Sequence, residues 1–212
     1  LDPSLAHSLG YFDIERSSFR SDLWREMTSL SLPEVVESAK IIGKYRKKIP
    51  VVTAIGDNQA SFLGSVREPE CGILLNVGTS GQICYLEPSG QQNPDTGLET
   101  RPYPTGEKFL VGASLTGGKS FDVLANLIED VATLLNTTVN PYKVLDKFVA
   151  PPAEPDMLRT VTTFKGTRKD PSRTGSISGI SLNNLTTERL YWSIARGIID
   201  ELYHMVDPTH KI

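Results

Sequence analysis

The chain has 212 residues, of which 39% are hydrophobic and 22% charged, so an ordered globular protein is expected rather than a disordered one. Its length is enough for one large domain with a buried core. The formal net charge of -3 provides no basic surplus of the kind that binding to nucleic acid or to an acidic membrane requires. Nucleic-acid-binding and membrane-binding proteins are therefore not the expected classes.

The sequence contains no recognisable targeting or membrane-spanning segment. No apolar run approaches the roughly 20 residues of a membrane span. The start, LDPSLAHSLGYFD, lacks the charged stretch and apolar stretch of a signal peptide. Cys71 and Cys84 match no metal-ligand spacing, and nothing demands an oxidising compartment. We expect a cytoplasmic protein, and because Leu1 is not an initiator methionine we expect further sequence upstream.

The first third of the chain predicts short elements followed by a buried strand. Residues 1–48 favour turns and short helical pieces, and the basic cluster at 44–48 is expected to be a solvated edge. The run IPVVTAIG has the character of a strand buried on both faces. It ends at Gly56-Asp57, and NQASFLGSV then predicts a helix. The apolar runs at 71–77 and 82–86, joined by GTSG, predict a hairpin.

Later segments alternate strands and helices. Residues 88–107 predict a loop, 108–113 a strand, and the helix after it has an apolar face. A short helix from Pro141, strands at 161–164 and 176–182, and a final helix capped by Thr186 or Thr187 follow. Strands that lead into helices indicate an α/β architecture. The apolar faces of the two longer helices are predicted to contain Phe121, Leu124, Ile128, Val131 and Leu135 in one, and Leu190, Ile194, Ile198, Leu202 and Met205 in the other.

One segment matches a nucleotide-binding pattern that could mislead. Residues 113–120, ASLTGGKS, satisfy a loose P-loop pattern with alanine at the first glycine, between a predicted strand and helix. On that hypothesis Lys119 would reach the terminal phosphates. A P-loop enzyme also needs an acid at the end of a later buried strand, and Asp200 lies instead in the final helix. The P-loop NTPase is therefore the weaker alternative.

An acid after a strand is the best candidate for catalysis. Asp57 follows Gly56 at the end of a predicted buried strand, where a carboxylate is held rigidly at a crevice. Such a carboxylate can accept the proton of a hydroxyl that attacks a phosphoryl group. Alternatively, Asp57 merely caps the following helix. The stretch AIGDNQAS resembles the motif that carries the catalytic aspartate in the FGGY carbohydrate kinase family.

Three further motifs match that family in order and spacing. Gly78, Thr79 and Ser80 lie in a turn that resembles the family's first phosphate contact, although GTSG also serves a simple hairpin. Gly117 and Gly118 resemble its second glycine-rich phosphate contact. The block at 164–180 resembles its late signature, which we interpret as mainly structural. Within it, an ion pair is the favoured role of Arg168.

The resemblance covers nearly the whole chain and implies a fold and a reaction. The implied fold is α/β, part of a two-lobed ribonuclease H-like (actin-like ATPase) sugar kinase. Residues 1–48 would be the tail end of the N-terminal FGGY lobe, and residues 49–212 an incomplete C-terminal lobe. The implied co-substrate is ATP with Mg²⁺, and no residue of this chain is assigned as a metal ligand. The expected partners are a small sugar and ATP, and a homo-oligomer is left open.

The resemblance also implies roles for particular residues. Asp57 would be the catalytic base, and Asp57 with Asn58 would contact the sugar. The nucleotide would bind at Gly78, Thr79, Ser80, Gly117 and Gly118. The forms GDNQAS, LTGGKS and TFKGTRKDP are most similar to the branch that converts sedoheptulose to sedoheptulose 7-phosphate. Kinases of xylulose, gluconate or glycerol remain alternatives.

Because the family's opening phosphate motif and its closing adenosine segment are not found in this sequence, we expect the chain alone to have little or no kinase activity. A non-catalytic interaction fragment is therefore a further alternative. It predicts no bound nucleotide and apolar surface exposed where the missing lobe would pack.

Overall fold

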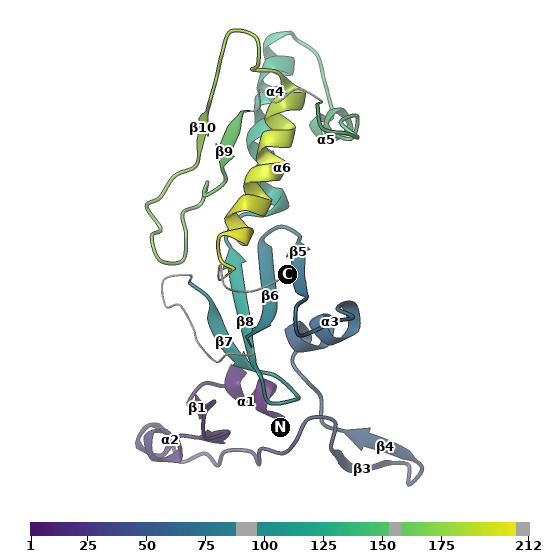
Figure 1. The fold of residues 1–212 in the computed structure, drawn as a ribbon, viewed down its shortest axis with the longest axis vertical. Coiled ribbons are helices and arrows are strands. Elements are labelled where there is room, and N and C mark those ends of the chain that lie inside the picture. The colour runs from purple at the N-terminus through teal and green to yellow at the C-terminus, as the bar shows by residue number, and fades with distance from the viewer. Residues whose placement is uncertain (88–96, 153–157, 207–212) are drawn as a thin grey trace. The chain divides into compact units, whose positions relative to one another are not determined.

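The computed structural model describes residues 1–87, 97–152 and 158–206 of the chain. These residues form two compact units, one made of residues 1–74 and 84–111 and the other of residues 75–83 and 112–206 (Figure 1). A four-stranded sheet has the order β5-β6-β8-β7. Its strands are β5 (Ile73–Val77), β6 (Gly81–Glu87), β7 (Glu99–Pro102) and β8 (Lys108–Ser114).

The first unit begins with short elements, as the sequence predicts. They are α1 (Pro3–Ser8), β1 (Phe12–Asp13), β2 (Ser18–Phe19), α2 (Ser21–Met27), β3 (Ile41–Tyr45), β4 (Ile49–Val52) and α3 (Asp57–Ser65). The core of this unit is aromatic, because Phe62 of α3 meets Tyr103 and Phe109 edge to face. Cys84, Leu86 and Val111 complete the core.

The second unit is mainly helical. It contains η2 (Gly118–Phe121), α4 (Asp122–Leu134), α5 (Pro141–Leu145), β9 (Arg159–Val161), β10 (Ser176–Ser178) and α6 (Thr187–Tyr203). Thr186 accepts a hydrogen bond from the Arg189 N–H, which confirms the predicted cap of α6. The buried stripe of α6 packs with residues of α4, α5 and the segment before β9; the cluster comprises Leu124, Leu145, Leu158, Leu190, Ile194 and Ile198.

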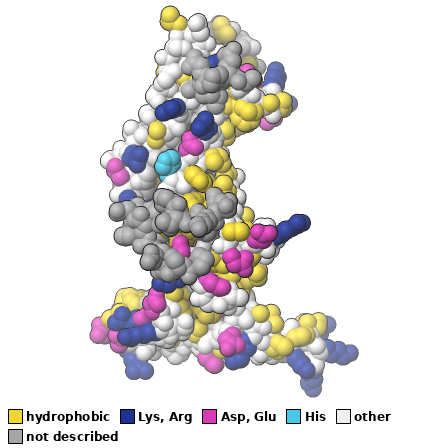
Figure 2. All heavy atoms as spheres, viewed as in Figure 1, with side chains coloured by type: hydrophobic (Ala, Val, Ile, Leu, Met, Phe, Trp, Pro, Cys, Tyr) yellow, Lys and Arg dark blue, Asp and Glu magenta, His cyan; other side chains and the backbone are white. Residues whose placement is uncertain are grey.

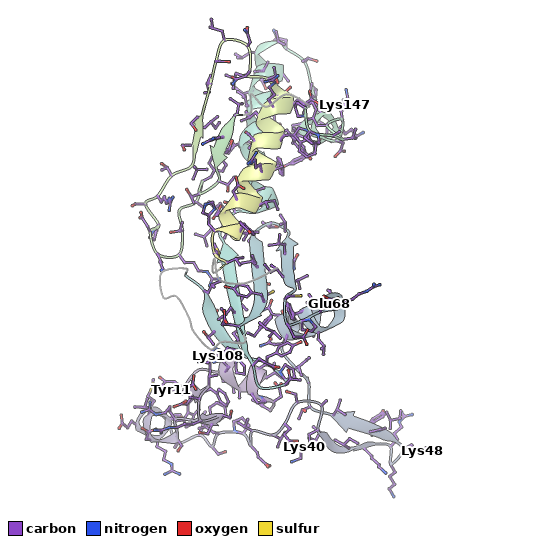
Figure 3. The ribbon with its side chains drawn as sticks, viewed as in Figure 1. Tyr11, Lys40, Lys48, Glu68, Lys108 and Lys147 are labelled. Atoms are coloured by element: carbon purple, nitrogen blue, oxygen red, sulfur yellow. The ribbon has the colours of Figure 1, made fainter. Side chains whose placement is uncertain are left out.

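The prediction that residues 49–56 form a strand that is buried on both faces and ends at Gly56-Asp57 is wrong. The strand β4 ends at Val52, and residues 53–56 between it and α3 are not in a strand. Within the described part of the chain, β4 pairs only with β3, in a two-stranded antiparallel hairpin, and both strands are exposed along their whole length. A run of β-branched residues suits a buried strand, but burial needs a covering layer that the described residues do not supply. Lys48 and the other basic residues at 44–48 gather at the tip of this hairpin, as the dark blue atoms in Figure 2 and the label in Figure 3 show.

Other predictions need smaller corrections. The predicted loop at 88–107 contains β7, while its residues 88–96 lie outside the described part of the chain. Val131 and Leu135 were expected in the buried face of α4 but are exposed, because Leu124, Ala125 and Ala132 form that face instead. β9 begins and ends earlier than the predicted strand at 161–164.

No helix among the described residues is long and apolar enough to cross a membrane.

Candidate functional site

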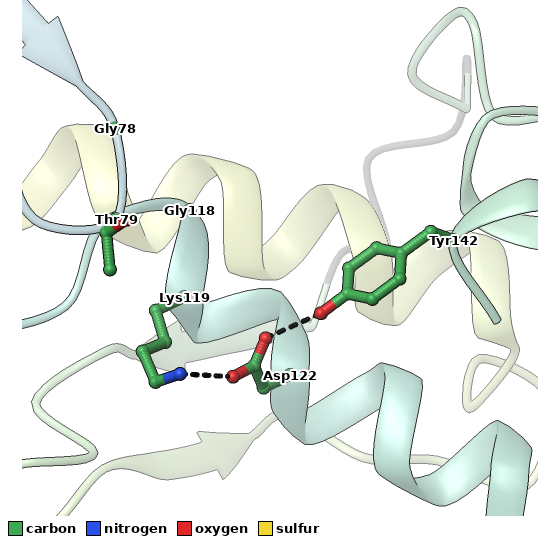
Figure 4. Close-up of a pocket in the computed structure, with 6 residues that line it drawn as sticks. All are labelled: Gly78, Thr79, Gly118, Lys119, Asp122 and Tyr142. Carbon is green, nitrogen blue, oxygen red and sulfur yellow. Dashed lines mark hydrogen bonds and ion pairs between the residues drawn. The ribbon is translucent and has the colours of Figure 1, made fainter.

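A hollow of about 300 Å³ lies in the second unit, where the turn after β5 meets the start of α4 (Figure 4). The turn contributes Gly78 and Thr79. Gly118 and Lys119 belong to η2, and Asp122 is the first residue of α4. Tyr142 of α5 completes the lining. The hollow therefore contains residues from both glycine turns that the sequence predicts to bind phosphate.

The two glycine turns are locked together through their backbones. The Gly117 N–H donates to the Thr79 carbonyl at 2.9 Å, and the Gly118 N–H donates to the Gly78 carbonyl at 2.7 Å. A Cβ on Gly117 would lie 2.5 Å from the carbonyl oxygen of Ser80, closer than atoms can approach. Glycine is thus required at Gly117 by this backbone contact, whether or not a ligand is present.

The contact also determines which groups are open to a ligand. The N–H groups of Gly117 and Gly118 already have backbone acceptors. Thr79 is exposed, and among the described residues its hydroxyl and N–H have no hydrogen-bond partner. Thr79 therefore offers free donors to a ligand. The predicted nucleotide contacts of Gly78, Thr79, Ser80, Gly117 and Gly118 remain predictions.

This hydrogen bonding disfavours the P-loop alternative. In a P-loop, the backbone amides of the glycine-rich loop surround the phosphates. Here the amides of Gly117 and Gly118 bind the neighbouring turn, and Ala113 and Ser114 belong to β8. The strands that follow in the described chain, β9 and β10, end without an acidic residue.

Lys119, Asp122 and Tyr142 form a connected polar group at the hollow. The Lys119 ammonium lies 3.0 Å from Asp122 Oδ2, and the Tyr142 hydroxyl donates to Asp122 Oδ1 at 2.7 Å. The Tyr142 hydrogen bond and the Lys119 ammonium hold the pKa of Asp122 below its usual value. The same hydrogen bond raises the pKa of Tyr142. Asp122 is therefore ionised and already paired.

Asp57, the predicted base, is the first residue of α3 in the first unit. Its side chain is exposed, and its Oδ1 accepts a hydrogen bond from the Asn58 N–H at 2.8 Å. The N-cap position of α3 is occupied by Gly56, so the capping role considered for Asp57 is not the one it has here. Asp57 and Asn58 thus belong to one unit, and the glycine turns to the other.

A buried polar network fixes the turn that presents Asp57. The Gly56 N–H donates to Ser4 Oγ at 2.8 Å, and that hydroxyl donates to Asp2 Oδ1 at 2.7 Å. Asp2 is fully buried and also accepts from Ser38 Oγ and the Leu5 N–H. This network was not predicted from the sequence. The available signal was an aspartate directly before a proline and serine, which is typical of a helix N-cap.

The late block at 164–180 shapes the backbone, as predicted. Gly166 has a positive φ of 76°, and a Cβ there would meet Pro171. A Cβ on Gly175 would meet the ring of Phe164. The ion pair favoured for Arg168 is not present among the described residues, where this side chain is exposed.

The described residues contain no group of three or more His, Cys, Asp or Glu side chains that could hold a metal ion. Asp122, a carboxylate that lines the hollow, is already paired with Lys119. No residue among those described is therefore assigned as a Mg²⁺ ligand.

Comparison with solved structures identifies the fold class. The chain is similar to a Plasmodium falciparum glycerol kinase solved with ADP, with a TM-score of 0.76 and 20% identity over 97% of this chain and 42% of that one. It is also similar to a gluconate kinase from Lactobacillus acidophilus, with a TM-score of 0.73 and 20% identity over 99% of this chain and 45% of that one. The predicted fold, that of the actin-like ATPase sugar kinases, is confirmed.

Sequence comparison then gives particular relatives. The chain is 27% identical to the sedoheptulokinase of Homo sapiens over 95% of this chain and 45% of that protein. It thus spans less than half the length of this relative. No family model matches the chain. The predicted resemblance is confirmed, because the sequence relatives are sedoheptulokinases and the structural neighbours are sugar kinases of the FGGY type.

Proposed function

We propose that the chain is part of an ATP-dependent sugar kinase that phosphorylates sedoheptulose at its 7-hydroxyl. The observation that carries this proposal is the hollow at the two interlocked glycine turns, in a chain whose sequence relatives are sedoheptulokinases. Residues 1–48 would be the end of an N-terminal lobe, and residues 49–212 part of a C-terminal lobe.

The reaction is a phosphoryl transfer to an alcohol. The sugar hydroxyl oxygen forms a bond to the γ-phosphorus of ATP as the bond from that phosphorus to the ADP oxygen breaks. Asp57 accepts the hydroxyl proton, and Asn58 contacts a neighbouring sugar hydroxyl. The Asp2–Ser4–Gly56 network supports this proposal, because it holds the start of α3 by buried hydrogen bonds and so limits the motion of Asp57.

In this proposal the phosphates bind in the hollow beside the two joined turns, next to Gly78, Thr79, Ser80, Gly117 and Gly118. The glycines let the two turns approach, and Thr79 donates hydrogen bonds. Mg²⁺, when bound with ATP, neutralises charge on the phosphates.

A phosphorylation screen tests the substrate. The intact protein is incubated with ATP and a panel that includes sedoheptulose, xylulose, gluconate and glycerol, and ADP release is measured. We expect sedoheptulose to give the highest kcat/KM. A higher kcat/KM for another member of the panel would make that compound the substrate in place of sedoheptulose. If no member of the panel is phosphorylated, the proposed kinase activity is refuted.

Substitution of Asp57 tests the base. Asp57→Asn in the intact protein is expected to lower kcat by about 10²- to 10⁴-fold, the usual contribution of a general base, and to leave sugar binding within a few-fold. Asp130→Asn, at an exposed aspartate of α4, is the matched control and should leave kcat unchanged. Retained turnover in Asp57→Asn would remove Asp57 from the mechanism.

A further inference from the structure

We propose that Lys119 binds the terminal phosphate of the nucleotide, exchanging Asp122 for the phosphate when ADP or ATP enters the hollow. This inference rests on the proposed function and goes beyond it, because neither the resemblance nor the comparisons assign a role to Lys119, Asp122 or Tyr142. It identifies a nucleoside di- or triphosphate as the ligand and its last phosphate as the recognised group.

Lys119 stands where it can reach a phosphate in the hollow. Lys119 directly follows the Gly117–Gly118 turn and lines the hollow beside Thr79, as Figure 4 shows. Thr79 contributes neutral donors, and Lys119 contributes the positive charge that a phosphate needs. Hydrogen bonds from charged groups to phosphate are about twice as strong as neutral ones.

Lys119 can be released from Asp122 at little cost in free energy. Its pair with Asp122 lies at the surface, with 43% and 34% of the two side chains exposed. Exposed ion pairs of this kind contribute about 0–1 kcal/mol. A phosphate carries more negative charge than one carboxylate and therefore competes well for the ammonium.

Asp122 keeps other favourable interactions when Lys119 leaves it. Tyr142 donates a hydrogen bond to the other carboxylate oxygen of Asp122, and Asp122 stands in the first turn of α4, where a negative charge is favoured. Lys165 also lies within electrostatic range and lowers the pKa of Asp122. Asp122 thus keeps favourable interactions after the exchange, and Tyr142 positions it.

Calorimetric titration of the intact protein with ADP and with AMP tests the inference. Lys119→Met is expected to weaken ADP binding about tenfold, the loss of one partly exposed charge-assisted hydrogen bond, and to leave AMP binding within twofold. Lys143→Met is the matched control, because Lys143 is exposed on α5 next to Tyr142 but does not line the hollow. It should change neither affinity.

The pair is tested by a double-mutant cycle. Asp122→Asn frees Lys119 and is expected to tighten ADP binding a few-fold, whereas in the Lys119→Met background it should have less effect. An equal effect in both backgrounds would mean that Asp122 acts only by its charge and would overturn the exchange. Melting temperatures of all variants establish that each one is folded.

The outcomes separate the inference from the proposed function. The inference is overturned, and the kinase proposal stands, if the wild type and Lys119→Met bind ADP equally well. The same holds if Lys119→Met weakens AMP binding as much as it weakens ADP binding. If the wild type binds no nucleotide, both fail. If Lys119→Met abolishes nucleotide binding while Asp57→Asn keeps full turnover, the P-loop NTPase replaces both.

Discussion

Individual side chains in this protein show how burial sets the behaviour of a charge. Glu201 of α6 is half-buried and accepts a hydrogen bond from the Thr162 hydroxyl at 2.6 Å. Burial raises the pKa of Glu201, an effect that outweighs the opposing contributions of Thr162 and Arg173. Its ionised form is therefore less stable in the folded chain than in the unfolded one.

The pH dependence of stability follows from this direction. Because the folded-state pKa of Glu201 is raised, the wild type loses stability as pH rises from the unfolded value of about 4.3 through the folded value. Glu201→Gln removes this loss and still offers an oxygen to Thr162. We expect the variant to match the wild type at about pH 4 and to be more stable at pH 7, measured by urea unfolding.

Glu129→Gln is the control for Glu201, because Glu129 is exposed on α4. Its stability should follow that of the wild type at both pH values. A Glu201→Gln variant that is less stable than the wild type at pH 7 would contradict the prediction.

At the scale of elements, the two glycine turns behave as one packed unit. A Cβ on Gly117 would lie 2.5 Å from backbone atoms of Ser80, which cannot move without breaking the turn. Gly117→Ala is therefore expected to destabilise the ligand-free protein by about 1–3 kcal/mol, the usual cost of overpacking. Thermal or urea unfolding measures this change.

Gly78→Ala is the matched control for Gly117, because a Cβ on Gly78 meets nothing within 4 Å and its φ is not positive. It should change stability by less than about 0.5 kcal/mol. Equal costs at both positions would show that the contact between the two turns is looser than described.

At the scale of the whole molecule, the β3–β4 hairpin leaves apolar side chains uncovered. Ile42 and Ile49 are each 60% exposed, and neighbours in the same hairpin are also exposed. A two-stranded hairpin is marginally stable without a covering layer. Exposed apolar surface of this kind is what the alternative of a non-catalytic interaction fragment predicts.

The exposure itself can be measured. The double variant Ile42→Ser and Ile49→Ser should bind less of a hydrophobic dye than the wild-type chain and keep its melting temperature, since side chains already in water contribute little to folding. Ile194→Ser, at a fully buried position of α6, is the contrast and should unfold the second unit. A large fall in the melting temperature of the hairpin variant would mean that the hairpin is covered.

Local chemistry explains the parts of the fold that could be predicted. The α6 stripe has a 3.6-residue period and a threonine before its first turn, so its cap and its buried face are encoded within one segment. The GTSG hairpin and the short helix that begins at Pro141 are likewise local. The candidate residues Asp57, Gly78, Thr79, Gly117 and Gly118 were found through ordered motifs along the chain.

Other features depended on contacts between segments far apart in the sequence. The exposure of β4 could not be predicted from its apolar residues, because burial depends on whether another layer covers the hairpin. The Asp2–Ser4–Gly56 network joins residues more than 50 positions apart. No local pattern encodes such a contact.

The sequence by itself determined the class of protein, since ordered motifs and their spacing need no coordinates, and it identified both glycine turns. Only the tertiary structure decided what those glycines do: Gly117 and Gly118 donate their amides to the Gly78–Thr79 turn. It also placed Lys119 against Asp122 and Tyr142. Both results depend on the distance between backbones and side chains that only packing brings together.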